Sequence, residues 1–165
     1  MSIPADSDLT ALAERTGCAL VSHHLKLAAA ESCTGGWIAK VMTDVAGSSG
    51  WFDRGFVTYS NAAKASMLGV CEHTLSSHGA VSEAAAREMV AGALARSEAD
   101  VACAVTGIAG PSGAVPGKPV GTVWLAWGRR GGRTAARVMH FDGNREAVRR
   151  QTVAEALRGV LAMLA

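Results

Sequence analysis

A serine stands where a short apolar run ends, in the segment Leu27-Ala-Ala-Ala-Glu31-Ser32-Cys33-Thr34-Gly35-Gly36. The run has the length of a buried strand, and the two glycines open a predicted helix. This order would deliver the Ser32 hydroxyl to the edge of a sheet, beside unpaired N–H groups at the positive end of a helix. Such a hydroxyl can act as a nucleophile, and such N–H groups suit an oxyanion or a phosphate. The alternative is an ordinary strand–turn–helix in which Ser32 or Thr34 only caps the helix.

A serine nucleophile needs a base, and Lys64 is the most interesting candidate because no histidine shares a motif with an acidic partner. The sequence predicts that Asn61 caps a short helix over residues 62–68. Lys64 then falls at the third helical position, a cation at the positive end of the dipole. The dipole contributes only about 0.3–1 kcal/mol, so burial would have to supply most of the lowering of the lysine pKa. A neutral lysine beside a serine is an established activating pair; a surface lysine near a helix start is the alternative.

Two later segments could contact a ligand. Thr106-Gly107-Ile-Ala-Gly110-Pro-Ser-Gly113 follows a wholly apolar run over residues 101–105, and its glycines allow close backbone approach to a ligand. The segment matches neither a P-loop nor a G-x-G-x-x-G fingerprint. Arg145, predicted just inside the last helix, is a second cation at a positive helix end. A bound anion would account for Arg145, and exposure on the helix surface is the alternative.

The composition predicts one soluble domain over residues 1–165. Hydrophobic residues make up 49% and charged residues 18%, which argues against disorder, and with only 5% aromatics the core must consist of Ala, Val and Leu. The formal net charge of +2 is too small to indicate direct nucleic-acid binding. No apolar run has the length of a membrane span, so we expect no membrane partner.

The cysteines indicate a reducing compartment. Cys18, Cys33, Cys71 and Cys103 are scattered without a C-x-x-C pair, so we expect free thiols and a cytoplasmic protein. The first eight residues lack the basic and apolar regions of a signal peptide. A metal cluster of Cys71 with two nearby histidines is conceivable, but its spacing matches no usual zinc pattern. We expect a solvated stretch there, and no metal.

Helices and strands alternate along the chain, which predicts an α/β fold: a three-layer α/β/α sandwich around a mixed, mostly parallel sheet. Polar loops follow the strand ends, where open α/β sheets usually bind ligands. The predicted helices cover residues 9–24, 36–44, 62–68, 82–97 and 144 onward, and the predicted strands cover residues 26–31, 52–60, 101–105, 120–127 and 133–141.

Several segments occur in the order of one known family. They are Glu31-Ser-Cys-Thr-Gly-Gly36, Tyr59-Ser-Asn61 with Lys64, Gly79-Ala-Val-Ser82, Thr106-Gly-Ile-Ala-Gly-Pro111 and Lys118-Pro-Val-Gly-Thr122. From about Leu9 to its end, the chain resembles the C-terminal domain of the competence/damage-inducible protein CinA, a family that includes stand-alone nicotinamide mononucleotide deamidases. The resemblance implies hydrolysis of the carboxamide of this small nucleotide to nicotinic acid mononucleotide and ammonia, in pyridine-nucleotide (NAD) salvage. It also implies a homodimer that needs no metal or other cofactor.

The resemblance assigns roles to several residues. Ser32 would be the nucleophile, Lys64 the general base, Tyr59 a neighbour of that pair, and Thr106 with its glycine loop a further part of the site. The N–H groups around Cys33–Gly36 could hold the oxyanion, and Arg145 with the glycines of the Thr106 loop could hold the ribose phosphate. The full set of expected substrate contacts is Glu31, Cys33, Thr34, Gly35, Gly36, Asn61, Gly107, Gly110 and Arg145.

One departure from the family pattern lies before the last helix. The family has Gly-Asp-Arg where this chain has Gly143-Asn144-Arg145. Asn and Asp cap a helix about equally well, so the fold should be unaffected. If the acidic charge orients Arg145, however, the affinity for substrate would change.

Two other functions compete with this reading. One is a non-catalytic nucleotide-binding or accessory module linked to competence or DNA repair, although such a module would need neither Ser32 nor Lys64. The other is an amidohydrolase that acts on a different amide. Fused members of the family carry a further N-terminal domain, and we expect any pyrophosphatase activity of that domain to be absent here.

Overall fold

One five-stranded sheet, in the order β2–β1–β3–β4–β5, organises the chain in the computed structural model, which describes residues 3–165. Residues 1 and 2, which the predicted domain includes, lie outside the described part. β1 pairs in parallel with β2 and β3, whereas β4 runs antiparallel to β3 and β5. The predicted mixed, mostly parallel sheet is therefore confirmed: four strands run in one direction, and β4 alone runs against them. The strands are β1 (Leu27–Glu31), β2 (Phe52–Val57), β3 (Val101–Gly107), β4 (Thr122–Arg129) and β5 (Thr134–His140).

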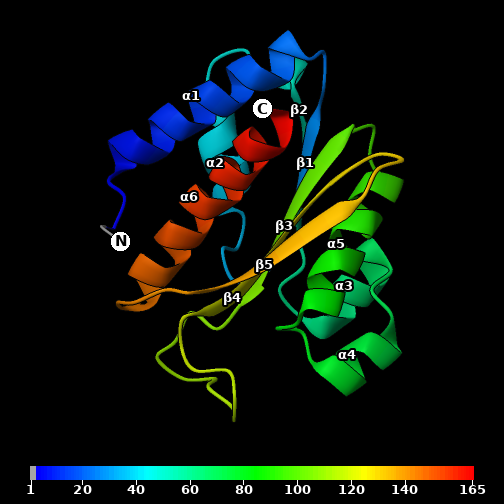
Figure 1. Cartoon of the computed structure of the whole chain (residues 1–165), viewed down its shortest axis with the longest axis vertical. Coiled ribbons are helices and arrows are strands. Elements are labelled where there is room, and N and C mark those ends of the chain that lie inside the picture. Colours follow the sequence, from blue (N-terminus) through cyan, green and yellow to red (C-terminus); the bar gives the residue numbers. More distant parts are fainter. Residues whose placement is uncertain (1–2) are drawn as a thin grey trace.

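Helices cover both faces of the sheet, which confirms the α/β/α sandwich (Figure 1). One face carries α1 (Asp6–Ser22), α2 (Trp37–Thr43) and α6 (Arg145–Leu164). The other face carries α3 (Asn61–Leu68), α4 (Glu72–His78) and α5 (Glu83–Ala95). A short 3-10 turn (Ser48–Gly50) precedes β2. Among the described residues, no helix combines the length and apolarity that a membrane crossing requires.

The hydrophobic core has two halves, one on each side of the sheet. Because side chains alternate along a strand, β3 sends Val101, Cys103 and Val105 to the half under α1 and α6, and Ala102 and Ala104 to the half under α5. The small side chains on the second face let α5 pack closely against the sheet. This arrangement explains how an alanine-rich chain with few aromatics builds a core.

The structure corrects several predicted boundaries. Ser60, not Asn61, caps α3, because its Oγ accepts a hydrogen bond from the Ala63 N–H at 3.0 Å. α3 therefore begins at Asn61, and Lys64 is its fourth residue rather than its third. The strand predicted over residues 52–60 ends at Val57, and the strand predicted over residues 101–105 continues to Gly107.

The stretch expected to be a solvated loop contains the helix α4. Most of its side chains are exposed, so the sequence lacks an apolar periodicity that would predict it. Glu88 of α5 holds its start, accepting from the Cys71 N–H at 2.7 Å and from Thr74 Oγ1 at 2.5 Å. Within residues 3–165, no group of three or more His, Cys, Asp or Glu side chains is placed to hold a metal ion.

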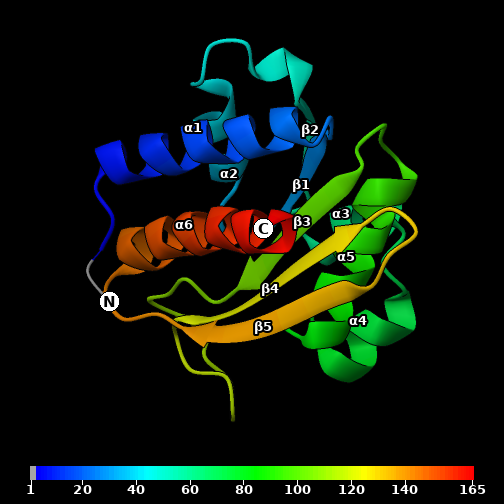
Figure 2. The ribbon, with the colours of Figure 1, turned by 45° about the horizontal axis from the view of Figure 1, so that its top comes forward.

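The carboxyl ends of the three parallel strands meet at one edge of the sheet. Glu31 at the end of β1 is in register with Val57 of β2 and Val105 of β3. The long connection between β3 and β4 projects from the body of the molecule (Figure 2). The carboxyl edge is thus where polar loops converge.

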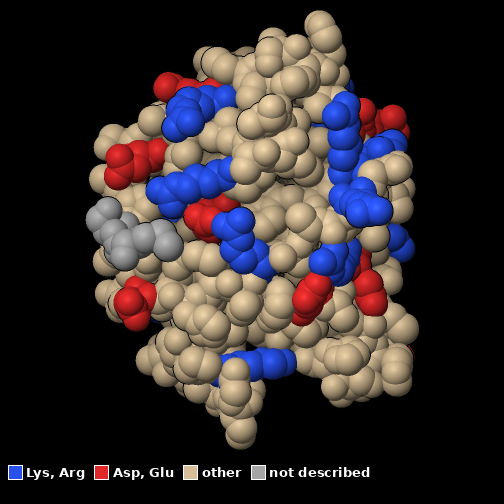
Figure 3. Space-filling model, viewed as in Figure 1, with Lys and Arg blue, Asp and Glu red and all other residues tan. Residues whose placement is uncertain are grey.

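Lys and Arg side chains lie among Asp and Glu side chains on the face shown in Figure 3, in keeping with the net charge of +2.

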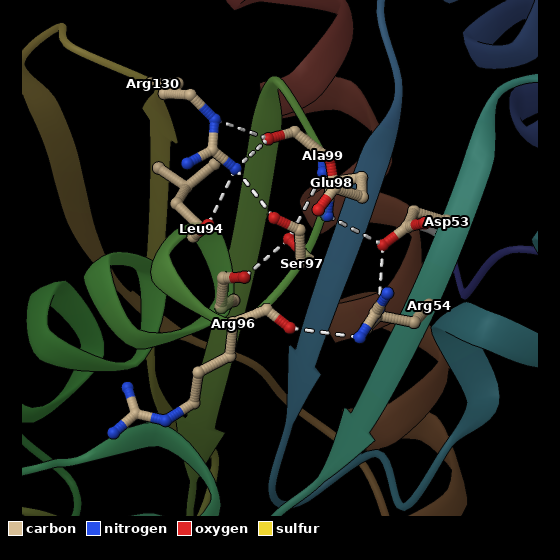
Figure 4. Close-up of polar contacts among 9 residues, drawn as sticks. Asp53, Arg54, Leu94, Arg96, Ser97, Glu98, Ala99 and Arg130 are labelled. Carbon is tan, nitrogen blue, oxygen red and sulfur yellow. Dashed lines mark hydrogen bonds and ion pairs between the residues drawn. The ribbon is translucent and has the colours of Figure 1, made fainter.

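The opposite edge, at the amino ends of the parallel strands, is closed by arginines that donate to backbone carbonyls (Figure 4). The Arg130 guanidinium donates to the carbonyls of Leu94, Ser97 and Ala99 at 2.7–3.2 Å. Arg54 donates to the Arg96 carbonyl at 3.1 Å. These bonds satisfy carbonyl groups at the end of α5 and in the loop that leads into β3.

Candidate active site

The turn between β1 and α2, residues Ser32–Gly36, lies at the carboxyl edge. Its first N–H, that of Ser32, donates to the Val105 carbonyl at 3.0 Å, and the Gly35 N–H donates to the Ser32 carbonyl at 3.1 Å. Gly35 and Gly36 both have positive φ, +60° and +97°, which glycine adopts without strain. The glycines therefore permit the tight reversal that leaves Ser32 at the end of the strand.

A buried carboxylate supports this turn from beneath. Glu31, fully buried, accepts hydrogen bonds from Thr34 Oγ1 at 2.6 Å and from the N–H groups of Gly36, Ile38 and Ala39 at 2.9–3.1 Å. A carboxylate at the positive end of a helix is favourable. The first N–H groups of α2 are therefore already occupied. Of the N–H groups that the sequence offers to an anion, those of Cys33 and Thr34 have no acceptor among the described residues.

Lys64 reaches Ser32 from the opposite side of the sheet edge. Its side chain is buried, with 1% of the residue exposed. Lys64 Nζ lies 2.9 Å from Ser32 Oγ and 2.9 Å from the Thr58 carbonyl oxygen, to which it donates. Ser60 starts α3 just after β2, so the fourth residue of the helix points back toward the end of β1. Two residues that are 32 positions apart thus form one contact.

The surroundings of Lys64 favour its neutral form. Burial lowers the pKa of Lys64, and the interaction with Cys33 opposes that shift only in part. No carboxylate among the described residues lies within ion-pair distance of Nζ. Burial also raises the pKa of the Cys33 thiol to about 12, so that this neighbour carries no charge at neutral pH. An amine in this setting can accept the proton of a serine hydroxyl.

Ser32 and Lys64 open into a pocket of about 280 Å³. Its lining joins the ends of all three parallel strands with the start of α6 and the segment before α5. A larger pocket of about 530 Å³ between α1, α2 and α6 contains no pair of nucleophile and base, so chemistry rather than volume identifies the site. The smaller pocket is lined by Ser32, Cys33, Tyr59, Asn61, Lys64, Ala80, Val81, Thr106, Gly107, Ala109 and Arg145.

The rim of the pocket is polar. Arg145 donates from Nη2 to the Tyr59 hydroxyl at 2.9 Å and from Nη1 to the Gly110 carbonyl at 2.8 Å. Tyr59 is exposed, so this arginine stands at the mouth of the pocket. Thr106 is buried and donates to the Ala80 carbonyl at 2.8 Å. Asn144 caps α6 through the Ala147 N–H at 3.0 Å, the capping role expected for this position.

The structure brings most of the predicted site residues together. Ser32, Cys33, Tyr59, Asn61, Lys64, Thr106, Gly107 and Arg145 line the pocket. Five of the predicted substrate contacts do not line the pocket. Four of them shape the turn after β1, namely Glu31, Thr34, Gly35 and Gly36. The fifth, Gly110, accepts a hydrogen bond from Arg145 through its carbonyl.

Sequence reasoning missed some of the residues around the site. Ala80 and Val81 line the pocket, and a signal for them existed in the Gly79–Ser82 segment. Thr58 contributes its backbone carbonyl to Lys64, and any residue type could have supplied that atom. No residue pattern would therefore have identified Thr58.

Comparison with known proteins gives a consistent result. The chain matches the family described as CinA C-terminal domain over residues 9–164. It is 56% identical over 153 residues to a protein of Escherichia coli (strain K12) named nicotinamide-nucleotide amidohydrolase PncC, covering 93% of each chain. A Pseudomonas putida protein of the same name is 54% identical over 153 residues, 93% of this chain and 95% of the relative. The crystal structure of competence/damage inducible protein CihA from Agrobacterium tumefaciens superposes with a TM-score of 0.92 at 46% identity, covering 99% of this chain and 98% of the other. The chain belongs to the CinA C-terminal domain family.

Proposed function

We propose that this protein hydrolyses the carboxamide of nicotinamide mononucleotide, giving nicotinic acid mononucleotide and ammonia, by a Ser32–Lys64 mechanism. The observation that carries the proposal is the buried Lys64 amine, which lies 2.9 Å from Ser32 Oγ and pairs with no carboxylate in the described part of the chain. The names of the two bacterial relatives supply the amide and its nucleotide. The product would return to NAD through pyridine-nucleotide salvage.

The first half of the reaction forms an acyl-enzyme. Ser32 Oγ attacks the carboxamide carbon while the neutral Lys64 amine takes the hydroxyl proton. The carbonyl oxygen becomes an oxyanion, for which the N–H groups of Cys33 and Thr34 are the donors left unpaired at the turn. When the tetrahedral intermediate collapses, the C–N bond breaks and the Lys64 ammonium protonates the departing nitrogen. Ammonia leaves, and the nicotinoyl group remains on Ser32 as an ester.

The second half releases the acid. A water molecule attacks the ester carbon, and Lys64, again neutral, takes a proton from that water. The second tetrahedral intermediate collapses by breaking the bond to Ser32 Oγ, which recovers its proton from Lys64. The products are a carboxylic acid and the enzyme in its starting state. One lysine thus serves as base and as acid in both halves.

Substrate binding would use the rim of the pocket. Arg145 stands at the mouth beside Tyr59, where its guanidinium can bind the ribose phosphate. Gly107 and Ala109, with the Thr106 side chain braced against the Ala80 carbonyl, would shape the wall against the pyridine ring. Asn61 also lines the pocket and would contribute a further polar group.

The setting of this reaction follows from the remaining predictions. We place the whole activity in a single domain over residues 1–165, which works without a metal or other cofactor. The four free cysteines favour a reducing compartment, the cytoplasm. We also propose a homodimer, which sedimentation equilibrium would test.

Ammonia release from nicotinamide mononucleotide by the purified protein tests the proposal, with Ser32→Ala and a chelator-treated sample alongside. Release that survives chelation and disappears in Ser32→Ala would support a metal-free serine amidohydrolase. No release from the folded wild-type protein would instead favour another amide substrate or a non-catalytic accessory role.

A further inference from the structure

Arg149 of α6 grips the turn that carries Ser32. Its Nε donates to the Cys33 carbonyl at 3.1 Å, and its Nη2 donates to the Thr34 carbonyl at 2.9 Å. Cys33 and Thr34 directly follow Ser32, and both lie more than 100 positions from Arg149 in the sequence. The side chain is half-buried, and no carboxylate among the described residues pairs with it. The guanidinium is therefore committed to two backbone carbonyls.

Holding a carbonyl also orients an N–H group. In a planar trans peptide, the C=O of one residue and the N–H of the next point in opposite directions. By holding the Cys33 carbonyl on the α6 side, Arg149 directs the Thr34 N–H away from α6. The Ser32 carbonyl accepts from the Gly35 N–H in the same way, which sets the direction of the Cys33 N–H. These two N–H groups are the ones that lack an acceptor among the described residues of the turn.

An aromatic ring fixes the guanidinium in place. The Cζ atom of Arg149 lies 5.2 Å from the centroid of the Trp37 ring, and that of Arg150 lies 5.0 Å from it. Trp37 is the first residue of α2, directly after the turn. A planar guanidinium group can stack on an aromatic ring and donate hydrogen bonds to two carbonyls at once, whereas the ammonium group of a lysine is a flexible point charge.

We infer that Arg149 is a positioning residue, which aims the N–H group of Thr34 at the oxyanion that forms when Ser32 attacks an amide. This inference rests on the proposed function. Arg149 touches no reacting atom; it acts through the backbone of the turn. An N–H group that binds the oxyanion and not the ground-state carbonyl contributes to kcat and leaves KM nearly unchanged.

The test compares Arg149→Ala and Arg149→Lys with Arg130→Ala. Arg130 is the matched control because its guanidinium also donates to backbone carbonyls, but at the opposite edge of the sheet. Losing one oxyanion donor typically costs about 10²–10³ in rate, so a misdirected donor in Arg149→Ala should lower kcat about 10- to 100-fold. KM should stay within about twofold. Arg149→Lys should fall between Arg149→Ala and wild type, and Arg130→Ala should keep the wild-type kcat.

Chemical rescue separates positioning from general loss of structure. Millimolar guanidinium should restore part of the turnover of Arg149→Ala, and none of the turnover of Ser32→Ala. Melting temperatures of all variants accompany the kinetics. An unchanged kcat in folded Arg149→Ala would overturn the inference, as would an equal loss in Arg130→Ala or a loss that guanidinium does not relieve.

A second readout does not depend on the nucleotide. The rate at which a sulfonyl fluoride labels Ser32, followed by intact mass, should fall in Arg149→Ala and stay normal in Arg130→Ala. If Ser32 is labelled in the wild-type protein but the protein releases no ammonia from nicotinamide mononucleotide, the proposed function fails. The labelling rates still decide the role of Arg149 in that case. If wild-type Ser32 neither reacts nor turns over, both proposals are overturned.

Discussion

Charged side chains and backbone polar groups lie at both the amino edge and the carboxyl edge of the sheet, but they are paired differently at the two edges. At the amino edge, charges and carbonyls are matched: Arg130 satisfies three carbonyls, and Asp53 accepts from Arg54 at 2.7 Å and from the Glu98 N–H at 3.2 Å (Figure 4). At the carboxyl edge, the Lys64 amine is buried and two N–H groups of the turn point to no acceptor, and within residues 3–165 no carboxylate pairs with the amine. The amine and the two N–H groups all lie close to Ser32.

This difference shows where the fold gives up stability. Buried polar groups are normally paired, and an unpaired one costs about 1–3 kcal/mol. The amino edge follows that rule, whereas the carboxyl edge departs from it at two N–H groups of the turn after Ser32. Lys64 is hydrogen-bonded there, but no carboxylate of the described residues pairs with it. Proteins tolerate such departures mainly where they serve chemistry. The amino edge should therefore respond to mutation in stability, and the carboxyl edge in activity.

The largest effect should come from Lys64→Met. Without the base, ammonia release should fall at least about 10³-fold, because members of a nucleophile–base pair act as a unit. The apolar side chain removes a buried amine that lacks a carboxylate, so the free energy of unfolding should rise by about 1 kcal/mol. Enzyme assays and urea unfolding measure the two effects. An active Lys64→Met, or one less stable than wild type by a similar amount, would contradict the comparison.

The same variant gives a pH test with a defined sign. Burial lowers the pKa of Lys64 in the folded state. At any pH between that lowered pKa and the ordinary pKa of lysine, the unfolded chain therefore binds more protons than the folded chain. The wild-type free energy of unfolding should therefore rise with pH through that window relative to Lys64→Met. The kcat/KM of the wild-type protein should rise with pH as Lys64 loses its proton. A flat difference in stability would mean that Lys64 keeps its ordinary pKa.

Much of the fold could be predicted from the sequence. The apolar runs that form β1 and β3 and the glycine turns after them are local signals, so the α/β sandwich and its mixed sheet could be inferred. α4 could not, because Glu72–His78 is mostly exposed and is held by Glu88 of a later helix. The strand ends also differ from the prediction, because β3 continues through Thr106 and Gly107 as an antiparallel partner of β4.

The site was less accessible, because its contacts join distant parts of the chain. Ser32 and Lys64 could be singled out separately, but their contact depends on the parallel pairing of β1 with β2. The sequence could not tell whether the Glu31 carboxylate turns toward the pocket or toward α2, and it turns toward α2. Arg149 carried no signal, since it binds backbone carbonyls and reads as one more surface arginine.

The next largest effect should come from Arg145→Ala, at the exposed rim of the carboxyl edge. If its guanidinium binds the ribose phosphate, the loss of a charged hydrogen bond should raise KM for nicotinamide mononucleotide about 10- to 100-fold, with a smaller change in kcat. Nicotinamide riboside, which lacks the phosphate, should be processed equally by both proteins. Steady-state kinetics with the two substrates makes the comparison.

Two observations sharpen the assignment of Arg145. An equal loss on both substrates would place the phosphate elsewhere. The variant Asn144→Asp introduces the acidic residue that the family resemblance leads us to expect at this position, while keeping a good helix cap. A lower KM for the phosphorylated substrate in Asn144→Asp would mean that an acidic charge orients Arg145, and an unchanged KM would limit Asn144 to capping α6.

A smaller effect, of the opposite kind, is expected at the amino edge. Arg130 is exposed, so its bonds to three carbonyls compete with water, and Arg130→Ala should lower the free energy of unfolding by only about 1 kcal/mol. In a chain of this size that corresponds to a drop of roughly 2–4 °C in melting temperature. Calorimetry measures the drop, and ammonia release should be unchanged. A loss of kcat without a loss of stability would break the contrast between the edges.

The smallest effect should be seen on alkylating the cysteines. Cys18 and Cys71 are exposed, whereas burial raises the pKa of Cys33 and of Cys103 to about 12. Because the thiolate is the reactive form, iodoacetamide should modify only the two exposed cysteines of the folded protein and leave its activity intact. Peptide mass spectrometry locates the label, and urea should expose all four sites. Labelling of Cys33 with loss of activity would reveal a reactive thiol in the pocket. If Cys33 is not labelled, burial keeps its thiol, intrinsically the stronger nucleophile of the turn, in the unreactive protonated form, and the reaction is left to Ser32.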